Sequence, residues 1–315
     1  METVLRTAFA PQFVILYIYV LSAIWVHYRG RDRHRFLRQL SDHSTLMAPI
    51  NCVMYAFSSV PGRPFVPTSR FPELSTLRKN WETIRDEAVA LYNDGQITGS
   101  KKYDDIGFNS FFRRGWTRFY LKWYGDFMPS AAENCPKTIE LLKQAPSVHA
   151  AMFAVLPAGG NLGRHRDPYA GSLRYHLGLR TPNSDSCRIY VDGAEYSWRD
   201  GQDVIFDETY IHSAFNDSEL DRIILFCDVE RPMNNPIARA INRFFGVTLM
   251  RAATARNVDG EKIGVLNRVF GVVYPVRARL KKFKKANRRG YYILKWSING
   301  FLLAVLLGTV ALRFI

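Results

Sequence analysis

The segment 150–229 constrains the fold most, because short apolar runs alternate there with turn-forming residues. The turns read PAGG, TPNSDS, VDG and RDGQ. The runs are five to eight residues long and cover 150–157, 173–180, 187–191, 203–207, 210–215 and 222–229. Many short strands at this spacing predict an antiparallel sandwich or barrel, so we expect a mainly β domain.

The part of the chain before this segment predicts a helix and one ambiguous element. Residues 74–94 place apolar side chains at helical spacing, and Gly95 follows as a stop signal. Residues 108–124 interleave aromatic side chains with arginine and lysine. Such a run could stack nucleic-acid bases, lie on lipid as an amphipathic helix, or form a core helix whose cations reach solvent. No recognised nucleic-acid motif accompanies it, which disfavours the first interpretation.

Both ends of the chain are apolar. Residues 8–28 contain no aspartate, glutamate, lysine or arginine, and residues 291–315 contain only Lys295 and Arg313. About 20 mostly apolar residues suffice to cross a bilayer core, so we predict transmembrane helices at 8–28 and 291–315. Basic residues flank both segments on the side of the central domain. The positive-inside rule then places that domain in the cytoplasm.

The net charge restricts the kind of binding partner expected, and the cysteine spacing restricts the metal and disulfide sites expected. The formal net charge is +15, which calls for an anionic partner. The basic clusters at 29–38 and 277–289 adjoin the apolar ends, so anionic lipid head groups explain the charge without nucleic acid. The four cysteines are far apart and form no CxxC pair, so we expect neither a zinc knuckle nor a disulfide scaffold.

Three residues within 165–212 have the types and spacing of a metal site. His165 and Asp167 stand two apart, so in an extended segment both side chains point to one face. His212 follows on another expected strand. Two imidazoles and one carboxylate with open positions opposite form the facial triad of non-haem iron(II) oxygenases.

Arg222 strengthens this interpretation. It begins the run 222–229, and strand alternation places it on one face with Ile224 and Phe226. A buried arginine needs a carboxylate, and the distal carboxylate of 2-oxoglutarate would suit its planar fork. Arg174 and His176, also two apart, could hold the other end of this cosubstrate.

Each of these residues also has an ordinary structural explanation. His165 could be a solvated loop residue, and Asp167 before Pro168 could initiate a turn. His212 could be a core histidine with satisfied hydrogen bonds. Arg222 could pair on the surface with Asp221 or Glu219. All of these would have to hold together for the site to be absent.

The two stretches that carry these residues resemble the aspartyl/asparaginyl β-hydroxylase family of 2-oxoglutarate oxygenases. They read GRHRDPYAGSLRYHLGLRTP and DGQDVIFDETYIHSAFNDSELDRIILFCDVERP. Within the family the chain looks most like the bacterial lipid A 2-hydroxylases, whose N-terminal half resembles 29–61, 69–88 and 115–125. Animal members have glycine where this chain has Asp167, which favours the bacterial branch.

The resemblance implies a double-stranded β-helix, or jelly-roll, with an N-terminal helical part and membrane helices at both ends. It implies iron bound by His165, Asp167 and His212, and 2-oxoglutarate bound by Arg174, His176 and Arg222, with O2 as oxidant. The expected divisions are a transmembrane anchor at 8–28, an N-terminal part at 29–149, the catalytic core at 150–232, a basic juxtamembrane region at 233–290 and a transmembrane segment at 291–315.

We therefore expect hydroxylation at C2 of a fatty acyl chain of lipid A or its precursor, at the cytoplasmic face of a bacterial inner membrane. One alternative is a β-hydroxylase of aspartyl or asparaginyl residues in proteins, which would share the metal and the cosubstrate. A second is a non-enzymatic membrane scaffold that binds anionic lipid without metal.

Overall fold

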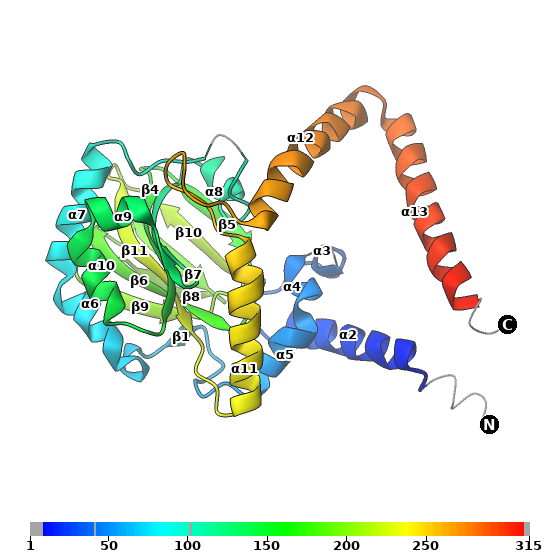
Figure 1. Ribbon diagram of the computed structural model, residues 1–315, viewed down its shortest axis with the longest axis horizontal. Coiled ribbons are helices and arrows are strands. Elements are labelled where there is room, and N and C mark those ends of the chain that lie inside the picture. The colour runs from blue at the N-terminus through cyan, green and yellow to red at the C-terminus, as the bar shows by residue number, and fades with distance from the viewer. Residues whose placement is uncertain (1–8, 41, 101–102, 312–315) are drawn as a thin grey trace.

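Two antiparallel β-sheets form the centre of the chain (Figure 1). The computed structural model describes residues 9–40, 42–100 and 103–311. The larger sheet has the strand order β1-β9-β6-β11-β4-β2-β3, and the smaller has β5-β10-β7-β8. The strands are β1 (Phe65–Val66), β2 (Thr117–Trp123), β3 (Asp126–Phe127), β4 (Val148–Leu156), β5 (Asn161–His165), β6 (Ser172–Arg180), β7 (Cys187–Val191), β8 (Ala194–Ser197), β9 (Asp203–Phe206), β10 (His212–Asn216) and β11 (Arg222–Glu230).

Helices precede the first strand, connect some of the strands and follow the last one. They are α2 (Pro11–Tyr28), α3 (Phe36–Leu40), α4 (His43–Leu46), α5 (Ala48–Ala56), α6 (Ser75–Lys79), α7 (Trp81–Asn93), α8 (Asn109–Phe112), α9 (Pro129–Asn134), α10 (Pro136–Lys143), α11 (Pro236–Phe245), α12 (Val265–Ala286) and α13 (Arg288–Ala311). Short 3-10 turns lie at Thr68–Arg70 and Pro72–Leu74, and a π-helical turn lies at Gly246–Met250. The predicted helix at 74–94 is thus divided at Asn80, which caps both α6 and α7.

The larger sheet is covered on both faces. On β11, Ile223 and Leu225 belong to the core shared with α6, α7, α9 and α10, which cover one face (Figure 1). Ile224, which lies between these two residues in the strand, belongs to a second core that includes Ala214 of β10 and Val191 of β7. Successive strand residues point to opposite faces, so this alternation packs the two sheets against each other. The predicted mainly β, jelly-roll architecture is confirmed.

The two apolar ends form helices, α2 and α13, and Ala8 and residues 312–315 lie outside the described part of the chain. Within that described part, no helix is long and apolar enough to cross a membrane. The prediction of bilayer-spanning helices at 8–28 and 291–315 is therefore not supported. α2 ends in the polar, buried His27, and α13 begins with Arg288 and Arg289.

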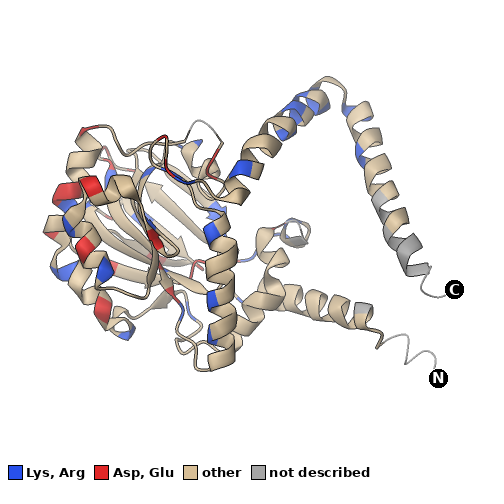
Figure 2. Ribbon diagram, viewed as in Figure 1, with Lys and Arg blue, Asp and Glu red and all other residues tan. Residues whose placement is uncertain are grey.

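The basic region forms a helix that extends away from the sheets. Figure 2 shows lysine and arginine concentrated along α12, which leads into α13. The side chains from Arg277 to Lys285 that carry this charge are exposed. Their predicted contact with anionic lipid head groups stays a prediction.

The aromatic and basic run 108–124 differs from all three interpretations offered for it. It forms the single-turn helix α8 and then β2, whose side chains from Arg118 to Leu121 are buried. Arg118 does not reach solvent, because it pairs with the buried Asp105 at 3.0 Å. The hydroxyl of Tyr120 donates to the same carboxylate at 3.1 Å. The cation is thus neutralised inside the protein.

Replacing Asp105 with alanine is expected to destabilise the protein by about 3–5 kcal/mol, because Arg118 would remain as a buried charge without its partner. A matched control is Asp126→Ala, which breaks the exposed Arg251–Asp126 pair and should cost less than about 1 kcal/mol. Urea unfolding of both variants measures the difference. Equal losses would show that the Asp105–Arg118 pair contributes no more than a surface ion pair.

Candidate metal centre and the buried arginine beside it

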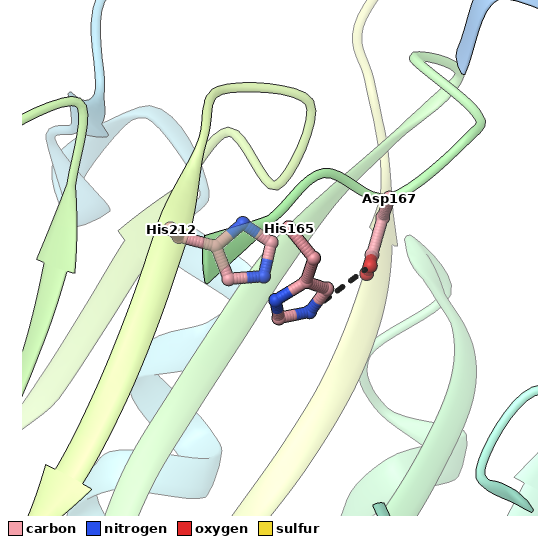
Figure 3. Close-up of side chains that lie close together, drawn as sticks. All are labelled: His165, Asp167 and His212. Carbon is pink, nitrogen blue, oxygen red and sulfur yellow. Dashed lines mark ion pairs between the residues drawn. The ribbon is translucent and has the colours of Figure 1, made fainter. Parts of the chain in front are cut away.

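Three side chains from the edge of the smaller sheet converge on one point (Figure 3). His165 ends β5, His212 begins β10, and the two residues are direct partners in the β5–β10 pairing. Asp167 follows β5, and its N–H donates to the carbonyl of Glu208 at 2.9 Å, which fixes this segment beside the β9–β10 loop. One candidate ligand atom from each of the three residues lies within 4.8 Å of the others. This spacing suits a single metal ion.

The two imidazoles are oriented for ligation through Nε2. Nδ1 of His165 donates to the carbonyl of Gly163 at 2.8 Å, and Nδ1 of His212 donates to the carbonyl of Tyr210 at 3.0 Å. A histidine whose Nδ1 carries the proton leaves the Nε2 lone pair for a metal. Burial lowers the pKa of both rings, that of His212 to about 3, so both are neutral near pH 7.

Asp167 is held by Arg174. Nη2 of Arg174 donates to Oδ2 of Asp167 at 2.6 Å, and Nη1 lies 3.1 Å from Oδ1 of Asp228. Burial alone would raise the pKa of Asp167, but the Arg174 guanidinium holds it below its ordinary value. The carboxylate is therefore ionised. The predicted contact of Arg174 with the cosubstrate stays a prediction, since here its guanidinium is engaged by two carboxylates.

The carboxylates around Arg174 were missed as neighbours of the site. Glu208 accepts a hydrogen bond from the Ser172 hydroxyl at 2.8 Å, and burial raises the pKa of Glu208 to about 8. Asp228 also accepts from the Tyr124 hydroxyl at 3.1 Å. Asp228 thus pairs with Arg174 and is not part of the three-residue cluster.

Replacing Arg174 with glutamine is expected to weaken iron(II) binding about 10–100-fold, because groups that orient a metal ligand typically have effects of this size. A matched control on the same strand is Arg180→Gln, since Arg180 stacks on Tyr92 away from Asp167. Anaerobic iron titration of both variants tests this. Unchanged iron affinity together with weaker 2-oxoglutarate binding would instead support the cosubstrate role predicted for Arg174.

Arg222 is fully buried, and none of its nitrogens has a hydrogen-bond partner among the residues that the structure describes. Its guanidinium lies between two indole rings, 4.1 Å from the centroid of Trp198 and 5.0 Å from that of Trp116. The surface pairing considered for it is excluded, because Asp221 instead accepts from the Tyr92 hydroxyl and the Ala158 N–H. Burial lowers the pKa of Arg222 to about 10, so it remains a cation near pH 7.

His176 lies beside one of these indole rings, with its ring centroid 5.9 Å from that of Trp198. It is buried, and its ring packs on Phe206 and Phe226. Within the described part of the chain, neither ring nitrogen has a hydrogen-bond partner. Burial and then the charge of Arg222 lower its pKa well below the ordinary value. Buried polar groups without partners are rare in folded proteins. His176 and Arg222 together therefore indicate a place prepared for an anionic ligand.

The two indole rings beside Arg222 were not found from the sequence. Trp116 comes from the segment before β2, and Trp198 follows β8. Both are buried, and no described residue accepts a hydrogen bond from their indole N–H groups. No local signal marks them, because only the packing of the two sheets brings them to Arg222.

Comparison with known proteins shows similarity across this region. The sequence model of the aspartyl/asparaginyl beta-hydroxylase family matches residues 78–232. The ornithine lipid ester-linked acyl 2-hydroxylase of Rhizobium tropici is 34% identical over 182 residues, which are 57% of this chain and 64% of that protein. The human aspartyl/asparaginyl beta-hydroxylase is 28% identical over 171 residues, 53% of this chain and 22% of that protein. The chain thus spans less than two thirds of either relative.

A solved structure of a Pseudomonas putida prolyl-4-hydroxylase is also similar. It shares 16% sequence identity and covers 49% of this chain and 88% of the other, with a TM-score of 0.33.

Proposed function

We propose that this chain is an iron(II)- and 2-oxoglutarate-dependent hydroxylase of a lipid acyl chain. The match of the aspartyl/asparaginyl beta-hydroxylase family model to residues 78–232 supports the proposal. The observation that carries the proposal is Arg222, a buried cation that pairs with no described residue, on the larger sheet, which packs against the sheet that carries the His-Asp-His cluster. Burying a charge without a partner destabilises the folded protein by roughly several kcal/mol. We therefore infer that a ligand compensates the charge of Arg222.

The residues present fit iron(II). Two neutral imidazoles and one carboxylate are the donor set of the facial triad, which leaves positions open for other ligands. His165 Nε2 is buried and has no hydrogen-bond partner among the described residues, so its lone pair is available to a metal. When bound, iron with 2-oxoglutarate and O2 would supply the oxidising chemistry that converts a C–H bond to an alcohol.

The polar groups around Arg222 also suit 2-oxoglutarate, a dicarboxylate. Arg222 would bind the distal carboxylate through its planar fork, and the two indole rings hold that fork in one orientation. His176 would offer a further hydrogen bond from its neutral ring. Phe206 and Phe226 pack on the His176 ring. Such apolar neighbours exclude water and so strengthen the ion pair between Arg222 and the carboxylate.

The finer proposal concerns the substrate. The printed name of the R. tropici relative specifies an acyl chain of a lipid. The described helices α2 and α12 expose apolar side chains such as Ile15, Leu21 and Val272, and α12 also exposes its basic residues. These features support action at a membrane surface. We propose C2 of an acyl chain of lipid A or its precursor, at the cytoplasmic face of a bacterial inner membrane, with ornithine lipid as the second candidate.

The experiment that tests the function supplies purified protein with iron(II), 2-oxoglutarate and O2, and offers lipid A, ornithine lipid or an aspartate-containing peptide. We expect a lipid to gain one oxygen atom by mass spectrometry while succinate forms in equal amount, and a chelator to prevent both. Hydroxylation of the peptide alone would favour the protein-directed alternative, which the human relative represents. Lack of iron binding and of succinate would favour the non-enzymatic scaffold.

A further inference from the structure

A cavity of about 470 Å³ lies at the junction of α2, α5 and the β9–β10 loop, outside the metal centre. Figure 1 shows α2 and α5 side by side at this end of the molecule. The walls combine aromatic rings from Trp25, Tyr28, Tyr55 and Tyr210 with the side chains of Arg29 and Arg231. Its size is that of a small-molecule site.

The walls carry an excess of positive charge. Arg29 and Arg231 both pair with the buried Asp207, with Nη2 of each lying 2.6 Å and 2.8 Å from its Oδ2. One carboxylate serves two guanidiniums, and none of the described residues that line the cavity is acidic. The described residues that line the cavity thus carry two cations and no anion.

The cations are also held in place before any ligand arrives. The Arg29 guanidinium is sandwiched between the rings of Tyr55 and Tyr210, 3.9 Å from each centroid. It donates to Thr209 Oγ1 at 2.8 Å, and Arg231 donates to the Ala170 carbonyl at 2.5 Å. A guanidinium has five N–H groups, so both arginines keep donors for a ligand. Fixed arginine forks suit the oxygens of a phosphate group.

The surroundings of the cavity suit a ligand with an apolar part. α2 exposes Ile18, Leu21 and Ile24 on the way to Trp25 at the cavity wall. Tryptophan and tyrosine favour boundaries between apolar and polar surroundings. Tyr210, which lines the cavity, also contacts the metal centre, because its carbonyl accepts the hydrogen bond from His212 Nδ1. A group bound here would lie one short loop away from the candidate iron.

We propose that this cavity binds the phosphate-bearing head group of the lipid substrate, with Arg29 and Arg231 as its counter-charges. The proposal rests on the lipid hydroxylase function proposed above, and it assigns the head group and the acyl chain to two sites joined by the β9–β10 loop. The head group then determines which lipids are accepted, and the metal centre determines the chemistry.

Gly62 allows a test that leaves the ion pairs intact. It lines the cavity, and a Cβ added there would meet nothing within 4 Å. Gly62→Asp places a carboxylate in the cavity, and Gly62→Asn is the neutral variant of the same shape. Arg29→Gln removes one cation directly and leaves Asp207 paired with Arg231.

Calorimetric titration of the full-length chain with soluble dihexanoyl phosphatidic acid measures binding. We expect wild-type and Gly62→Asn protein to bind alike, and both Gly62→Asp and Arg29→Gln to bind about 10–100-fold more weakly, as the loss of a hydrogen bond to a charged group predicts. Dihexanoyl phosphatidylcholine, whose head group has no net charge, and inorganic phosphate should both bind wild-type protein more weakly than phosphatidic acid.

Equal binding of the two lipids, or unchanged binding in both charge variants, would overturn the assignment. Inorganic phosphate binding as tightly as phosphatidic acid would identify a free-phosphate site instead of a lipid site. The titration needs neither iron nor 2-oxoglutarate. A failure of the hydroxylase proposal would therefore appear in the turnover assay and not here.

Discussion

Replacing His212 with alanine is expected to abolish both iron binding and 2-oxoglutarate consumption, and to leave the protein folded. The variant keeps only His165 and Asp167 of the three ligands, and two protein ligands hold iron(II) weakly at a site that is open on the other side. The imidazole makes one hydrogen bond, to the Tyr210 carbonyl, so few contacts of the fold depend on it. Metal analysis and succinate formation measure the loss.

His149→Ala is the matched control for this experiment. His149 lies on β4, is partly exposed and pairs with Glu230 at 3.3 Å, away from the candidate ligands. It should retain full iron content and turnover. Circular dichroism of both variants establishes that they are folded. Full activity in folded His212→Ala protein would remove His212 from the metal centre and with it the three-ligand assignment.

Strand positions were largely predictable because the chain alternates apolar residues between turns. The predicted run 187–191 coincides with β7, and 222–229 falls one residue short of β11. The runs 150–157 and 203–207 likewise lie within one or two residues of β4 and β9. β5 and β8 were not predicted, because their sequences NLGRH and AEYS carry too many polar residues to read as strands. Both belong to the smaller sheet, which buries less of its surface.

The run 108–124 shows where local pattern is insufficient. Its aromatic residues are as frequent in strands as in amphipathic helices, and its arginines suggested exposure. Asp105, only a few residues earlier, decides the outcome by pairing with Arg118 inside the protein. The ion pair between Asp105 and Arg118 forms only in the folded protein, so the residues next to either partner in the sequence do not predict it.

The candidate site was predictable to the extent that it depends on spacing. His165 and Asp167 share a segment, and strand parity relates Arg174 to His176. The indole rings around Arg222 and the pairing of Arg174 with Asp167 arise from contacts between separate strands. Sequence spacing carries no information about them, so their roles could be seen only in the folded protein.

Replacing Arg222 with methionine is expected to raise the stability of the cosubstrate-free protein and to remove 2-oxoglutarate binding. The guanidinium is fully buried with no partner among the described residues, so the unliganded protein bears its desolvation cost without compensation. Replacing buried charge with an apolar side chain of similar volume often stabilises a protein by about 1–4 kcal/mol.

The opposite effect is expected on the cosubstrate. A carboxylate that loses its buried partner costs about 3–5 kcal/mol, which corresponds to roughly two to four powers of ten in 2-oxoglutarate affinity. Arg222→Lys keeps the charge and loses the bidentate fork, so its affinity for 2-oxoglutarate should lie between those of wild-type and Arg222→Met protein. Arg188→Met is the control, since Arg188 pairs near the surface with Asp217 and should affect neither property strongly.

Thermal unfolding with increasing 2-oxoglutarate, with iron present throughout, measures both effects in one experiment. Wild-type protein should unfold at a rising temperature as the cosubstrate accumulates, because a ligand of the folded state stabilises it by mass action. The Arg222→Met variant should unfold at a higher temperature than wild-type protein without 2-oxoglutarate, and its unfolding temperature should not change as 2-oxoglutarate is added. A structural role for Arg222 would produce the reverse pattern, a lower starting temperature with the normal rise, because a residue that holds the two sheets together is needed whether or not the cosubstrate is bound. The two explanations thus differ in the sign of the change before any 2-oxoglutarate is added, and that sign does not depend on the lipid substrate proposed above.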